Sequence, residues 1–158
     1  MEEEMKTVKL FFNVSFVFYL LALIMLLFLG NRGYMWADLS LLEYIKSSSN
    51  VVPFKTINTY FQAIFDGSMN LDIPIKNLGG NIFMFLPMGI YMPFFITKLT
   101  RVSIFTTFMI ALLFIIETLQ LLTRTGSFDI DDFILNMLGA LLGYGIWKTL
   151  PFQKFVRQ

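Results

Sequence analysis

Acidic and amide side chains recur at helical spacing in the second half of the chain. Glu117, Gln120 and Arg124 occupy positions i, i+3 and i+7, which share one face of a helix. A second stripe follows at steps of three and four residues and consists of Asp129, Asp132, Asn136, Gly139 and Gly143. Asn81 stands at one end of a further apolar segment. Side chains of these types suit ligand binding or acid–base chemistry.

The chemistry open to these residues is that of oxygen and nitrogen groups, because the sequence contains no Cys and no His. Disulfides, thiolate nucleophiles, histidine bases and soft-metal sites are therefore excluded. Asp129, Asp131 and Asp132 offer hard oxygen ligands for Mg²⁺ or Ca²⁺. Glu117, Asp129 and Asp132 are the candidates for a catalytic carboxylate, and a desolvated Glu117 would suit a general base. The structural alternatives are an ion pair of Glu117 with Arg124 and a helix-capping aspartate.

Composition places these groups in a membrane protein. Of the 158 residues, 56% are hydrophobic and only 15% are charged, whereas a soluble domain carries about 25% charged residues. The mean hydropathy is +0.69. The formal net charge of +1 argues against nucleic-acid binding through bulk electrostatics.

Four apolar segments are long enough to cross a bilayer, which takes about 20 helical residues. They comprise residues 10–29, 79–97, 102–122 and 133–150. The sequence thus predicts an all-α integral membrane protein, a four-helix bundle forming one domain over residues 1–158. In the long connection, residues 30–78, amphipathic spacing predicts short interfacial helices over 56–66 and, more weakly, over 35–45.

The distribution of Lys and Arg predicts the orientation. One side of the predicted bundle carries dense cations, namely Lys6, Lys9, Lys98, Arg101, Lys148, Lys154 and Arg157. We expect this side to be cytoplasmic, with both termini on it. Every unusual polar group then lies near the outer end of its helix, where an isolated polar group in hydrocarbon would cost several kcal/mol. We therefore expect one outward-facing ligand pocket formed by Asn81, Glu117, Gln120, Arg124, Asp129, Asp132 and Asn136.

Several short motifs, in order, resemble those of the VanZ-like family of bacterial membrane proteins. They are Asn50-Val-Val-Pro53-Phe54, Asn81-x3-Phe85-Leu-Pro87-Met-Gly89, Glu117-x2-Gln120, Arg124, and Ser127-Phe128-Asp129-Ile-Asp131-Asp132-x3-Asn136-x2-Gly139-x3-Gly143. The resemblance covers about residues 50 to 145. It implies a role at the cell envelope, most often of Gram-positive bacteria. Together with the four apolar segments, we expect a multi-pass protein of the bacterial plasma membrane. The founding member is associated with low-level teicoplanin resistance, and the family has no established reaction.

Two hypotheses for the function follow. The first is a non-enzymatic envelope protein that binds or shields an amphiphile, such as a membrane lipid, a lipid-linked wall precursor or a lipoglycopeptide. The second is a membrane enzyme that acts on a lipid or lipid-phosphate head group with its carboxylates, with or without Mg²⁺ or Ca²⁺. Transport is a weaker third reading, which would need a homo-oligomer to complete a polar path.

Overall fold

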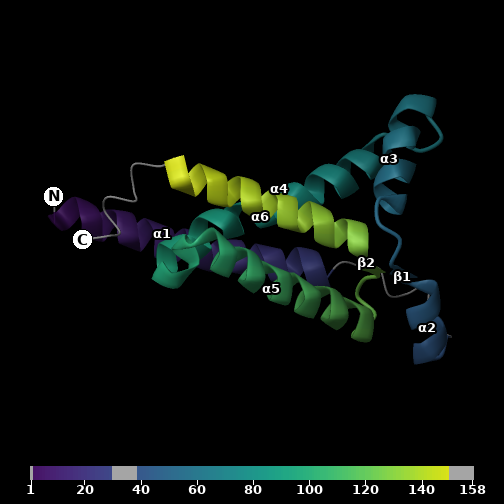
Figure 1. Ribbon diagram of the computed structural model, residues 1–158, viewed down its shortest axis with the longest axis horizontal. Helices are drawn as coiled ribbons and strands as arrows, with labels where there is room; N and C mark the ends of the chain where they lie inside the picture. The colour runs from purple at the N-terminus through teal and green to yellow at the C-terminus, as the bar shows by residue number, and fades with distance from the viewer. Residues whose placement is uncertain (1, 30–38, 150–158) are drawn as a thin grey trace.

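Four long helices make up most of the structure, a computed structural model that describes residues 2–29 and 39–149 (Figure 1). They are α1 (Glu2–Phe28), α4 (Asp72–Phe95), α5 (Val102–Leu122) and α6 (Ile130–Thr149). In the described part of the chain, three helices are long and apolar enough to cross a membrane: Lys6–Phe28 of α1, α4 and α5. The chain is therefore a mostly helical membrane protein.

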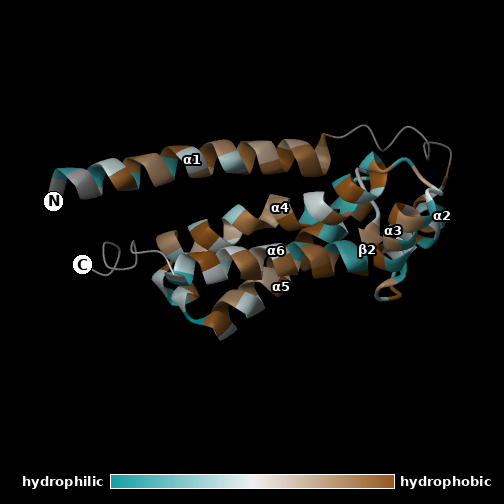
Figure 2. Cartoon of the chain, turned by 90° about the horizontal axis from the view of Figure 1, so that it is seen from above, coloured by the Kyte–Doolittle hydropathy of each residue, from teal (hydrophilic) through white to brown (hydrophobic). Residues whose placement is uncertain are grey.

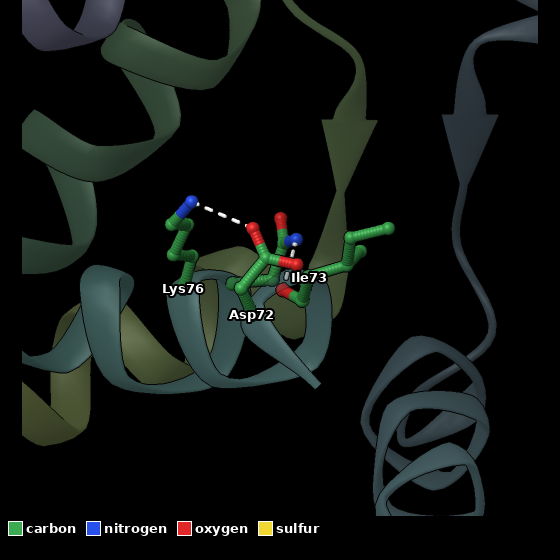
Figure 3. A network of polar contacts seen from close by, with 4 residues as sticks. Asp72, Ile73 and Lys76 are labelled. Atoms are coloured by element: carbon green, nitrogen blue, oxygen red, sulfur yellow. Dashed lines mark hydrogen bonds and ion pairs between the residues drawn. The ribbon is translucent and has the colours of Figure 1, made fainter. Parts of the chain in front are cut away.

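Two of the helices begin well before their apolar segments do. α4 starts at Asp72 rather than at the predicted residue 79. Its first turn has an acidic residue, which suits the positive helix N-terminus, and Pro74, which is tolerated there. Asp72 also pairs with Lys76 one turn on, at 2.7 Å (Figure 3). Likewise, α1 starts at Glu2 rather than at residue 10. Hydropathy marks where a helix becomes apolar. It does not detect the polar turns that precede the apolar part of the same helix.

Glycines allow α4 and α6 to pack closely. A Cβ atom on Gly143 would collide with the carbonyl oxygen of Leu86, and one on Gly139 with that of Ile82. From the other side, a Cβ on Gly89 would collide with the backbone of α6 at Ala140. The Gly139-x3-Gly143 spacing predicts such an interface between helices. This contact fixes the distance between the two helices that carry Asn81 and Asp132.

Aromatic side chains hold α1 against α4. The rings of Phe12 and Phe94 stack with centroids 4.2 Å apart, and those of Phe16 and Tyr91 are 5.1 Å apart. The Tyr19 hydroxyl donates a hydrogen bond to the carbonyl oxygen of Met84 at 2.8 Å. Most large side chains of α1 are exposed, and the helix is apolar along most of its length (Figure 2), as expected of a surface that contacts lipid.

Short elements gather at one end of the bundle, where Figure 2 shows many hydrophilic residues. They are α2 (Leu41–Ser47), β1 (Ser49–Asn50), α3 (Lys55–Asp66) and β2 (Phe128–Asp129). β1 and β2 pair in parallel, with Asn50 opposite Asp129. The all-helical prediction omitted this pair, because two-residue strands leave no periodicity in a sequence. At the opposite end, η2 (Thr97–Thr100) joins α4 to α5.

The long connection contains two helices among its described residues. α3 covers the segment 56–66 for which the sequence predicts a helix, and it ends at Gly67 with a φ of 66°. On its apolar face Phe61 and Phe65 are exposed and contact each other, with ring centroids 5.0 Å apart. α2 covers the end of the weaker stretch 35–45, of which residues 35–38 lie outside the described residues. The interfacial position of both helices stays a prediction.

Candidate functional site

Glu117 and Gln120 are buried at the end of α5 where the short elements gather. Glu117 is 3% exposed, and its Oε2 accepts a hydrogen bond from the Asp129 backbone N–H at 3.4 Å. The Gln120 amide donates to the carbonyl oxygen of Leu27 at 2.9 Å. Leu27 is next to the last residue of α1, where helix carbonyls lack an intrahelical partner. Gln120 thus links α5 to the end of α1.

A short polar bridge joins α4 and α6 at the same level. The Asn81 Nδ2 donates a hydrogen bond to Asp132 Oδ1 at 2.6 Å. Asp132 lies in the first turn of α6, where a carboxylate also suits the helix dipole. One turn further along α6, Asn136 is 2% exposed, and its Oδ1 has no hydrogen-bond partner in the structure. A buried acceptor without a partner is uncommon in proteins and calls for a donor from a bound molecule or water.

These residues line one small cavity of about 30 Å³. Its lining consists of Leu26, Leu27, Asn81, Met84, Glu117, Gln120, Gly126, Ser127, Asp132 and Asn136. Five of the seven predicted pocket residues are therefore brought together from three helices. By the same measure of volume a water molecule needs about 10–15 Å³, so the cavity accommodates about two water-sized groups.

Arg124 lies outside this lining. Its guanidinium sits over the Tyr44 ring, 5.5 Å from the centroid. Tyr44 is buried, and its hydroxyl donates to the carbonyl oxygen of Gly126 at 2.6 Å. The sequence alone offers no sign of this contact, because Tyr44 comes from α2, about 80 residues before its partners. Arg124 also has a left-handed backbone, with a φ of 56°, where the chain turns after α5.

Asp129 binds the first loop of the chain instead of lining the cavity. Its Oδ1 accepts from Asn50 Nδ2 at 3.0 Å, and its Oδ2 accepts from the Thr56 hydroxyl at 2.6 Å. Together with the β1–β2 pair, these bonds hold the segment around Asn50 against the start of α6. Asn50 is the first residue of the Asn-Val-Val-Pro-Phe motif, which thereby gains a structural role.

Asp131 caps α3 from a different helix. The residue is completely buried, and its carboxylate accepts from the backbone N–H groups of Phe54, Thr56 and Ile57. The N-cap residue of α3 is Phe54, which makes no side-chain cap bond and has a φ of 65°. The distant carboxylate takes over this function. Sequence patterns describe caps supplied by the local chain, so they do not reveal this role.

The three aspartates proposed as metal ligands each bind groups of the protein itself. Asp129 contacts Asn50 and Thr56, Asp131 the start of α3, and Asp132 the amide of Asn81. Within residues 2–29 and 39–149, no group of three or more Asp or Glu side chains is placed to hold a metal ion. Of the three catalytic candidates, Glu117 and Asp132 line the cavity and Asp129 does not.

Comparison with known proteins gives a match to one protein family. A family model described as VanZ/LLP1 matches residues 16–151, a range that includes every residue of the cavity. No curated protein and no solved structure matches the chain.

Proposed function

Because this chain belongs to the VanZ/LLP1 family, we propose that it is a multi-pass protein of the bacterial cell envelope that binds the head group of an amphiphile. The ligand is a membrane lipid, a lipid-linked wall precursor or a lipoglycopeptide. By binding or shielding such a molecule, the protein contributes to teicoplanin resistance. The site is the cavity between α4, α5 and α6.

The observation that carries this proposal is the orphaned acceptor of Asn136 inside a polar cavity. Six polar side chains, five of them from the long helices, line it in a protein whose other long-helix residues are mostly apolar. Burying polar groups in hydrocarbon costs several kcal/mol unless they are hydrogen-bonded. The Asn136 Oδ1 has no such bond within the described structure. A bound head group with a hydrogen-bond donor would satisfy it.

The proposal includes a fourth span and a defined orientation. α6 has 20 residues and lies alongside α4 (Figure 1), long enough to cross a hydrocarbon core of about 30 Å. Its glycine-based contact with α4 supports a position within the same layer of the membrane. With four spans, the short elements and the cavity end lie outside, and the η2 turn with its neighbours Lys98 and Arg101 lies in the cytoplasm.

Cysteine labelling tests this orientation without interference from native thiols, since the chain has none. We expect Ser68→Cys, in the turn between α3 and α4, to react with a membrane-impermeant maleimide on intact cells. Thr97→Cys, in η2, should react only after the cells are lysed. Both positions are exposed in the folded protein. The reverse pattern would contradict the proposed orientation, and labelling of both from outside would contradict the span count.

Mass spectrometry of amphiphiles retained on the purified protein tests the site itself. We expect Glu117→Gln and Asp132→Asn to reduce retention roughly tenfold each, because each removes a charge-assisted hydrogen bond of about 1.5–3 kcal/mol. Protein abundance and melting temperature should stay close to the wild type. Asp66→Asn, which removes an exposed carboxylate at the end of α3, is the matched control and should retain the ligand.

A structural role for the same residues gives a different result. In that case Glu117→Gln and Asp132→Asn would lower abundance and melting temperature in step with any loss of ligand. That outcome, or retention equal to the wild type in both variants, would refute the binding function of the cavity.

A further inference from the structure

A groove at the η2 end of the molecule provides a second site, at the opposite end of α5 from the cavity. Residues of η2 and of the first turns of α5 line it, and its volume is about 500 Å³. We propose that it binds an anionic phospholipid of the leaflet at this end, which is cytoplasmic in the proposed orientation. An acyl chain lies in the groove and the phosphate lies at Lys98. This inference goes beyond the proposed function and does not depend on the cavity.

The walls of the groove are mainly apolar. They include Ile96, Leu99, Ile104 and Phe108, beside the first turns of a helix that is long and apolar enough to cross a membrane. Apolar hollows of proteins stay dry, and the molecules that surround a membrane helix at this depth are lipids. The volume of about 500 Å³ is typical of sites for small molecules, which measure about 300–1,000 Å³. An acyl chain is therefore the occupant that fits the apolar part.

Positive charge at the rim of the groove selects the head group. Lys98 lines the groove, Arg101 is the N-cap residue of α5, and both side chains are exposed. The sequence has no Asp or Glu between Asp72 and Glu117 that could neutralise them, and the acidic run that opens α1 is followed by two lysines. The positive end of the α5 dipole adds to the same field. Clusters of Lys and Arg at a membrane surface attract anionic lipid head groups.

Two hydroxyl groups complete the polar side of the groove. Ser103 and Thr107 are one turn apart on α5, and both line it. Further along α5, the hydroxyls of Thr118 and Thr123 donate to the carbonyl oxygens four residues earlier, at 2.7 and 2.6 Å. The described part of the chain shows no such bond for Ser103 or Thr107. Their hydroxyls can therefore donate to the phosphate and ester oxygens of one lipid, which lie at successive depths in the membrane.

Two phospholipids with the same chains test the choice of head group: dioleoyl phosphatidylglycerol, which is anionic, and dioleoyl phosphatidylcholine, which has no net charge. Each is titrated into the full-length protein in a neutral maltoside detergent, and native mass spectrometry counts the bound lipids. We expect phosphatidylglycerol to bind saturably and at least about tenfold more tightly, since each cation near an anionic head group contributes about fivefold. Glycerol 3-phosphate should not bind detectably, because it has no chain to occupy the groove.

Variants then locate the site. Lys98→Gln should weaken the binding of phosphatidylglycerol about fivefold and leave that of phosphatidylcholine unchanged. Lys9→Gln, which removes an exposed cation of α1, is the matched control and should keep the wild-type affinity. Thr107→Trp should weaken the binding of both lipids, because the indole ring fills the groove. Ile115→Trp, at an exposed position about two turns further along α5, should not.

Three results would overturn the proposal. Equal affinity for the two lipids, or an equal loss in Lys9→Gln and Lys98→Gln, would refute the anionic head group at this rim. Unchanged affinity in folded Thr107→Trp would refute the groove as the place of the chain. Absence of saturable binding of either lipid would mean that another part of the chain or a second copy covers the groove. The comparison on the wild-type protein needs no variant, and none of these results bears on the cavity.

Discussion

Gly143→Ala is expected to destabilise the folded protein by about 3 kcal/mol, at the upper end of the cost of overpacking. The added methyl group would collide with the carbonyl oxygen of Leu86. This obstacle is backbone in the middle of α4, which cannot move aside as a flexible side chain would. Relief requires α4 and α6 to separate along their whole contact, with loss of the packing around Gly89 and Gly139.

Gly145→Ala is the matched control for this prediction. Gly145 lies on the same helix two residues further on, and a Cβ atom there would meet nothing within 4 Å. We expect its stability to stay within about 1 kcal/mol of the wild type, the range of helix propensity differences between Gly and Ala. Equilibrium unfolding in mixed micelles measures both variants. Equal stability of the two would mean that α4 and α6 lie further apart than described.

Asp131→Ala is expected to have an effect of similar size, about 3 kcal/mol, for an electrostatic reason. The carboxylate accepts from three backbone N–H groups at the start of α3, and hydrogen bonds to charged groups contribute about 1.5–3 kcal/mol each. Its removal leaves those donors without their partner and an empty space in a completely buried position. The stability of Asp131→Asn should lie between those of the wild type and Asp131→Ala, because the amide keeps one acceptor oxygen.

Hydrogen exchange makes this prediction specific to the cap. In Asp131→Ala the amides of Phe54, Thr56 and Ile57 should exchange at least about tenfold faster, since they lose a bond worth more than about 1.4 kcal/mol. The amides of α5 should change much less. Asp66→Ala, at the exposed end of the same helix, serves as the control. Unchanged protection of the three amides would show that another group caps α3.

The sequence predicted the apolar segments because hydropathy is averaged over many residues and tolerates local irregularity. It also predicted that Asn81, Glu117, Gln120, Asp132 and Asn136 share a level, since helical spacing and a common end of each helix determine that placement. The structure places all five around one cavity. Whether the cavity binds a ligand stays a prediction.

What could not be predicted depends on contacts between distant parts of the chain. The partners of Asp131 lie about 75 residues earlier, and a carboxylate that caps a remote helix has the same sequence signature as a metal ligand. Arg124 shares a helical face with Glu117 in the linear pattern, but α5 ends at Leu122 and the chain turns with a positive φ. The helical projection therefore ends two residues before Arg124, and its guanidinium lies over the Tyr44 ring, a contact that the projection does not contain.

The cap on α3 also constrains the order in which the protein can be completed during synthesis. The parts that it joins, the start of α3 and the start of α6, are separated by up to 77 residues. A ribosome adds residues from the N-terminus, so α1, α2 and α3 leave it well before Asp129 and Asp131 exist. Until then, the first turn of α3 has only water as a partner for its backbone N–H groups. The end of the bundle that carries the short elements is thus completed only when β2 and α6 are made, and a nascent chain that stops after α5 has every component of the first loop but lacks the carboxylates of Asp129 and Asp131 that bind it.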